Sequence, residues 1–100
     1  MSTNKYSVVL TAYEYSVLNK NYLISTVCKK QLRSATEHDE EIELSMTFDE
    51  LEELTGYVAA ESNHAKTRRQ REELGAICDY LEVLISGMRR ARRAGLANTT

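Results

Sequence analysis

The sequence YSVVLTAYEYSVL at residues 6–18 is followed by a similar stretch, IELSMTFDELEEL, at residues 42–54. In both stretches apolar residues occupy every second position, then a Thr is followed three residues later by a Glu, which pairs Thr11 with Glu14 and Thr47 with Glu50. Such alternation is typical of a β-strand with one buried face, and the Thr and Glu form the capping box that begins a helix. We therefore predict two strand-to-helix units.

The composition is that of an ordinary small globular protein. The 100 residues include 42% apolar and 28% charged residues, with a net charge of -2, and a chain of this length predicts one domain over residues 1–100. We expect residues 1–4 and 94–100 to fray. No apolar run is long enough to span a membrane, and the first residues lack the apolar core of a signal peptide, so we expect a soluble cytoplasmic protein without membrane contact.

The predicted fold is a helix-rich α+β fold of order β-α-β-α-α. Strands are expected at residues 6–10 and 41–46, and helices at 12–35, 48–63 and 67–92. Leu18, Tyr22 and Val27 form the expected buried stripe of the first helix. Residues 36–41 contain no apolar residue and are expected to form a loop. A single helix running through residues 63–66 is the alternative for the second half.

Two strands cannot make a stable sheet by themselves. If both lie in one sheet with the first helix as the crossover, they are parallel. The second strand, however, alternates apolar residues with Glu and Ser, which favours an edge strand with one solvated face. We therefore expect a homodimer in which two copies build a four-stranded sheet across a two-fold axis.

The last helix carries a heptad pattern that predicts close packing against another helix. That helix is either the preceding one or its copy in a partner chain. We assign the seam as the candidate interface, formed by Leu74, Leu81, Ile85 and Met88.

Catalytic, metal and cofactor signals are weak. Glu61 and His64 are three residues apart, the spacing used by di-iron carboxylate bundles, and they are the only metal candidates that we retain. Cys28 and Cys78 lie among apolar residues and are expected to be buried free thiols. Glycines are scattered and form no phosphate-binding loop. The sequence therefore predicts no catalytic residue and no cofactor, and it disfavours an enzyme.

Two basic clusters offer another function. Arginine matches phosphate geometry, so these clusters are candidates for nucleic-acid contact. A net negative charge weakens that reading, because a DNA-binding domain is usually basic overall. The cluster residues are Lys66, Arg68, Arg69, Arg71, Arg89, Arg90, Arg92 and Arg93.

The sequence thus favours a non-catalytic protein-interaction module, working as a homodimer and acting as a regulator or an adaptor. A nucleic-acid-binding regulator that uses the basic clusters is the first alternative. A metal-binding helical protein that uses Glu61 and His64 is the second.

Overall fold

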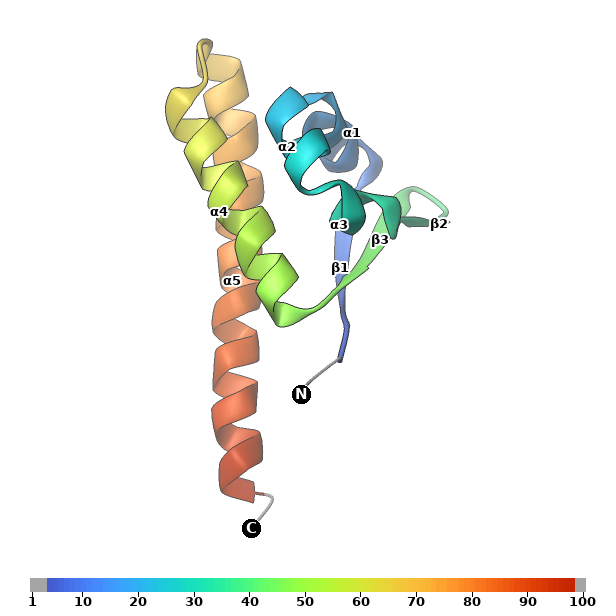
Figure 1. The fold of residues 1–100 in the computed structure, drawn as a ribbon, viewed down its shortest axis with the longest axis vertical. Coiled ribbons are helices and arrows are strands. Elements are labelled where there is room, and N and C mark those ends of the chain that lie inside the picture. The colour runs from blue at the N-terminus through green and yellow to red at the C-terminus, as the bar shows by residue number, and fades with distance from the viewer. Residues whose placement is uncertain (1–3, 99–100) are drawn as a thin grey trace.

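The computed structural model describes residues 4–98, with only the backbone for residues 91–98. Its elements are β1 (Tyr6–Thr11), α1 (Ala12–Lys20), α2 (Tyr22–Val27), α3 (Lys29–Arg33), β2 (Thr36–His38), β3 (Glu41–Met46), α4 (Phe48–His64) and α5 (Arg68–Asn98). The helix-rich α+β class predicted from the sequence is confirmed. Figure 1 shows α4 and α5 as an antiparallel pair, with the sheet and the three short helices on one side of it.

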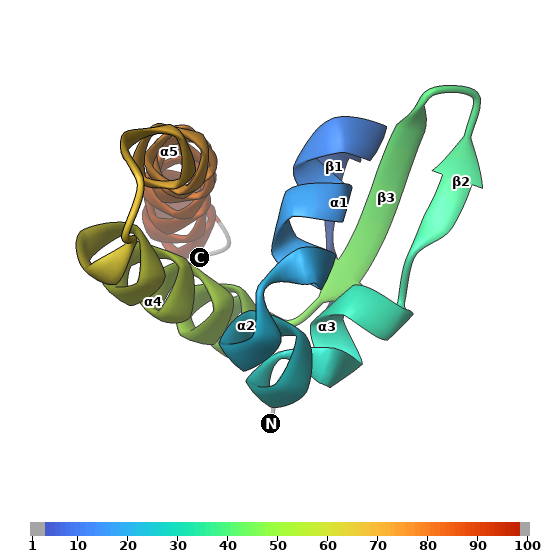
Figure 2. The same ribbon diagram turned by 90° about the horizontal axis from the view of Figure 1, so that it is seen from above.

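The three strands form an antiparallel sheet of order β1-β3-β2. Val8 lies opposite Leu44 in the β1–β3 pair, and Thr36 lies opposite Glu43 in the β2–β3 pair. The parallel arrangement considered for the two predicted strands is therefore wrong, and so is the prediction that residues 41–46 form an edge. In Figure 2 the strand β2 is outermost, on the side of the sheet away from α4 and α5.

The single helix predicted over residues 12–35 is three helices, and the reason lies in two local breaks. Asn21 has an extended backbone and its side-chain oxygen accepts a hydrogen bond from the Ile24 N–H, so it ends α1 and caps α2. Asn favours this position because its short side chain satisfies a free N–H of the next helix. A second break at Cys28 separates α2 from α3. After α3 the chain enters β2, which runs parallel to β1, and the hairpin turn then reverses it into β3, the antiparallel neighbour of both strands.

The segment 36–41, predicted to be a loop, contains β2 and the turn of a hairpin with β3. Asp39 in this turn has a φ of 58°, a left-handed conformation that Asp and Asn tolerate better than most residues. The prediction failed because β2 is exposed along its whole length, so it carries no apolar alternation. Charged, short strands of this kind are usual at the edge of a sheet.

The core lies between the sheet and the helices. β1 and β3 bury the apolar residues of one face, and α4 and α5 bury theirs against these and against each other. The fully buried large side chains include Leu10, Leu18, Ile24, Leu44, Met46, Leu51, Leu54, Ile77 and Leu81. Cys28 and Cys78 are buried free thiols, as predicted.

The predicted break between the last two helices is confirmed, because α4 ends at His64 and α5 begins at Arg68. The helix α5 continues to Asn98, six residues beyond the predicted end, and its last turns extend past the rest of the molecule in Figure 1. The fraying predicted for residues 1–4 and 94–100 stays a prediction, since 1–3 and 99–100 lie outside the described residues. No helix within residues 4–98 is long and apolar enough to cross a membrane.

Both predicted capping boxes are present. The Thr47 hydroxyl accepts a hydrogen bond from the Glu50 N–H at 3.2 Å, and the Thr47 N–H donates to the Glu50 carboxylate at 2.8 Å. Thr11 and Glu14 make the same pair of contacts at the start of α1. The capping residue is therefore the last residue of β1 (Thr11) and the residue directly after β3 (Thr47).

Replacing Thr47 with alanine should lower the free energy of unfolding by about 1 kcal/mol, because the Glu50 N–H loses its acceptor. Urea unfolding followed by circular dichroism measures this loss. Thr47→Ser is the matched control, since it keeps the hydroxyl, and should stay close to the parent protein. Equal losses for both variants would mean that the cap contributes nothing at this position.

Candidate interaction surface

The structure does not assemble the metal site that Glu61 and His64 suggested. The Glu61 carboxylate accepts a hydrogen bond from Asn21 Nδ2 at 3.0 Å, and His64 Nδ1 lies 2.8 Å from the Ala60 carbonyl oxygen. Within the described residues, no group of three or more His, Cys, Asp or Glu side chains is placed to hold a metal ion. The Glu61 contact instead joins the start of α2 to α4.

The basic clusters lie at opposite ends of α5. Arg68 and Arg90 are separated by about 33 Å along the helix axis at 1.5 Å per residue, so the clusters cannot form one patch. Lys66, Arg68, Arg69 and Arg71 lie at its start and Arg89 and Arg90 toward its end, while the side chains of Arg92 and Arg93 lie outside the described part of the chain.

Three of these arginines are paired with carboxylates. Arg68 contacts Glu72 at 3.1 Å and Arg69 contacts Glu73 at 3.4 Å, both one turn along the same helix. Arg89 contacts Glu52 of α4 at 2.6 Å and lies over the Phe48 ring. The Arg89 contact joins α5 to α4. All three pairs reduce the positive potential that a phosphate backbone would meet. The geometry does not favour nucleic-acid binding, which stays an untested alternative.

The heptad seam packs inside the chain. Leu74, Leu81 and Ile85 are buried, and Met88 is partly buried against the same core. Of the two arrangements that the spacing allowed, the structure has the seam against α4. Three of these four candidate interface residues are covered within a single chain, so a partner would have to use another surface.

A polar cleft of about 380 Å³ lies between α1 and the first turns of α5. Its central contacts are internal: the Tyr13 hydroxyl donates to the Glu73 carboxylate, which Arg69 also contacts. Lys20 lies at the same cleft. Because Tyr13 and Arg69 both contact Glu73, these three side chains join α1 to α5 across the cleft.

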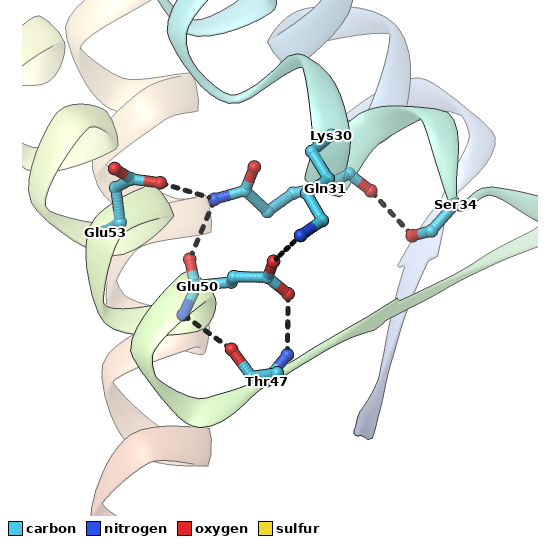
Figure 3. A network of polar contacts seen from close by, with 6 residues as sticks. All are labelled: Lys30, Gln31, Ser34, Thr47, Glu50 and Glu53. Carbon is cyan, nitrogen blue, oxygen red and sulfur yellow. Dashed lines mark hydrogen bonds and ion pairs between the residues drawn. The ribbon is translucent and has the colours of Figure 1, made fainter. Parts of the chain in front are cut away.

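Figure 3 shows a polar network that joins α3 to the first turns of α4, and a further hydrogen bond from Ser45 ties the end of α3 to β3. The Gln31 side chain is only 2% exposed, and its Nε2 donates to the Glu50 carbonyl oxygen at 3.1 Å and to Glu53 Oε1 at 2.9 Å. The Ser34 hydroxyl donates to the Gln31 carbonyl at 2.7 Å and accepts from the Ser45 N–H at 2.9 Å. A buried Gln31 amide without these hydrogen bonds would cost free energy. The network therefore favours the one orientation of α3 in which the amide is satisfied.

Lys30 joins this network through Glu50. Its Nζ lies 3.0 Å from Glu50 Oε2. The pKa of Glu50 is lowered, first by the hydrogen bond from the Thr47 N–H and then by the one from Lys30. The neighbouring cations Lys29 and Arg33 are exposed, and neither makes an ion pair within the described chain. The charges of Lys29 and Arg33 are therefore directed to solvent, while Lys30 is paired with Glu50.

The helix α2, which precedes these cations in the chain, exposes apolar side chains. Tyr22 is 84% exposed, and Leu23 and Val27, one turn apart on the same helix, are each more than a third exposed. A shallow hollow of about 580 Å³ connects α2 to α3 and is lined by Val27, Lys29, Lys30, Arg33 and Ser34. We refer to the residues Tyr22, Leu23, Val27, Lys29, Lys30 and Arg33 as the α2–α3 surface.

The sequence did not predict this surface. Tyr22 and Val27 were placed in the buried stripe of a long helix, but the breaks at Asn21 and Cys28 change the rotation of each helix about its axis and turn both side chains outward. The signal that could have revealed the first break was Asn21, a strong capping residue three positions before Ile24.

Comparisons with known proteins give no family for this chain: no family model, curated protein or solved structure matches it.

Proposed function

We propose that this chain is a non-catalytic protein-interaction module that works as a homodimer, as a regulator or an adaptor. The observation that carries the proposal is the α2–α3 surface, where the exposed Val27 adjoins the unpaired cations Lys29 and Arg33, and where α2 also exposes Tyr22 and Leu23. Tyrosine, arginine and apolar residues in one patch are typical of protein interfaces. The buried network around Gln31 supports the proposal, because it presents this surface in one orientation.

The charge distribution supports a second copy as the partner. The hairpin that follows α3 exposes the acidic residues Glu37, Asp39 and Glu40. The same chain thus carries a basic surface and an acidic one, and complementary charges direct association and select the partner. We also propose a cytoplasmic location, which the two free, buried cysteines support because thiols stay reduced there.

Light scattering coupled to gel filtration tests the homodimer. At tens of micromolar in low salt, the expected mass is twice the chain mass of 11.4 kDa, and the dimer should weaken as salt rises because charge pairs contribute to it. A mass of one chain across this concentration range would contradict the proposal.

A further inference from the structure

The two edge strands of the sheet differ in how many of their outward-facing backbone groups already form hydrogen bonds with side chains. On β1, the Tyr80 hydroxyl donates a hydrogen bond to the Val9 carbonyl at 2.8 Å, and the Thr11 N–H donates to the Glu14 carboxylate at 2.9 Å. Side chains therefore cap two outward-facing groups of this edge. A capped edge is a poor template for pairing with another strand, which leaves β2 as the edge suited to pairing.

The register defines which backbone groups β2 presents. Val9 directs its carbonyl away from β3 toward Tyr80, so Glu43, which lies opposite Val9, directs its backbone groups toward β2. Thr36 lies opposite Glu43 and uses its backbone groups toward β3. Glu37, the next residue, therefore directs its N–H and C=O to the outer side, on a strand whose three residues are all exposed.

The two ends of β2 carry opposite charge. Lys29 and Arg33 on α3 precede the strand, and Asp39 and Glu40 in the hairpin turn follow it. When two copies of a strand pair antiparallel about a two-fold axis, the beginning of one lies beside the end of the other. The basic end of each copy then meets the acidic end of the other, and this match occurs twice.

We propose that two copies of this chain pair through the outer edges of β2, forming a six-stranded antiparallel sheet across a two-fold axis beside Thr36. In this register the two Thr36 residues face each other and each Glu37 lies opposite Ala35 of the other copy, which avoids two glutamates directly opposite. The Asp39–Glu40 turn of each copy lies against the basic hollow of α3 in the other. The inference rests on the proposed homodimer and names its surface.

The contact with the hollow is needed because β2 is short. A strand of three residues gives few hydrogen bonds, whereas stable interfaces bury on the order of 1,200 Å² or more in total. The hollow of α3 adds Val27 and three cations, and the network around Gln31 holds it rigid. The α3 side of the contact is therefore formed before association, which limits the entropy lost on binding.

A cysteine at the axis tests the pairing directly. Thr36→Cys should give a disulfide-linked dimer under mild oxidation, because residues opposite each other in a non-hydrogen-bonded antiparallel pair have Cα atoms about 4.5 Å apart, within the range for a disulfide. The native cysteines are buried and should not compete. Ser7→Cys on the exposed side of β1 is the control and should stay monomeric on a denaturing gel.

Charge-reversal variants supply a second test, because two variants with complementary charges should pair with each other when they are mixed. Lys29→Glu with Arg33→Glu makes both ends of β2 acidic, and Asp39→Asn with Glu40→Lys removes or reverses the acidic end. Asn is chosen because residue 39 has a φ of 58°, which Asn tolerates. Each variant alone should raise the dimer dissociation constant at least about tenfold, whereas an equal mixture should form a heterodimer. Lys30 is left unchanged because it holds Glu50.

The results of these experiments distinguish failure of the β2 interface from failure of the homodimer. A wild-type dimer that gives no Thr36→Cys crosslink, or that both charge variants leave intact, would overturn the β2 interface while the homodimer stands. A wild-type monomer would overturn both. Crosslinking at Thr36 together with complementation by the mixed variants is the result that we expect.

Discussion

Replacing Leu81 with alanine should lower the free energy of unfolding by about 3 to 5 kcal/mol. Leu81 is fully buried, where α5 packs along α4, so the variant loses the transfer free energy of its side chain and leaves a cavity. A small domain has a total stability of roughly 5 to 15 kcal/mol. The substitution should therefore remove a large part of it, measured by urea unfolding at one fixed protein concentration.

Val83→Ala is the matched control for this experiment. Val83 lies two residues further on α5 but is 66% exposed, so its truncation should change the free energy of unfolding by less than about 0.5 kcal/mol. The comparison also distinguishes the two roles that the heptad spacing allowed. If Leu81→Ala left a single chain as stable as the parent and only weakened association, the seam would lie between copies, and its placement against α4 would be wrong.

Raising the pH from 9 to 11 should remove on the order of 2 kcal/mol of stability through Cys28 alone, at about 1.4 kcal/mol per pKa unit. Burial raises the pKa of this thiol from its ordinary value of 9.0 to about 11, and the Glu53 carboxylate adds to the effect. The folded chain therefore keeps the proton more tightly than the unfolded chain. This contribution is complete below pH 9.0 and is lost as the pH rises through the folded value.

Cys28→Ala isolates the thiol from other groups that titrate in the same range. Burial also raises the pKa values of Cys78 and Tyr80, so the parent protein should lose additional stability in alkali. The difference in slope between the parent and Cys28→Ala, from urea unfolding at several pH values, reports Cys28. Identical slopes would show that this thiol ionises as easily in the folded chain as in the unfolded one.

Much of the fold could be predicted from short stretches of sequence. The alternation in residues 6–10 and 42–46 identified two strands, and the Thr and Glu pairs at 11/14 and 47/50 located two helix starts. Each signal depends on contacts within a few residues. A capping hydrogen bond spans three positions and a buried strand face repeats every two, so no knowledge of distant segments is needed.

The candidate surface could be predicted much less well. β2 gives no periodic signal because all its residues are exposed, and its strand conformation depends on β3 as a partner. Glu61 and His64 have the spacing of metal ligands, yet Glu61 pairs with Asn21 from another helix and His64 contacts the Ala60 carbonyl of its own helix. The α2–α3 surface arises from breaks at Asn21 and Cys28, where weak local signals compete with a helical pattern that continues across both of them.

The sequence by itself determined where the two longer strands lie, how α1 and α4 begin and which residues of α5 form its apolar seam. Only the tertiary structure decided that β3 lies between two other strands, that the seam packs within one chain and that β2 forms an exposed edge. The physical reason is the range of the interactions. Caps and periodicity act over a few residues, whereas strand order and helix packing depend on how the turns at Asn21 and Cys28 direct the chain through space.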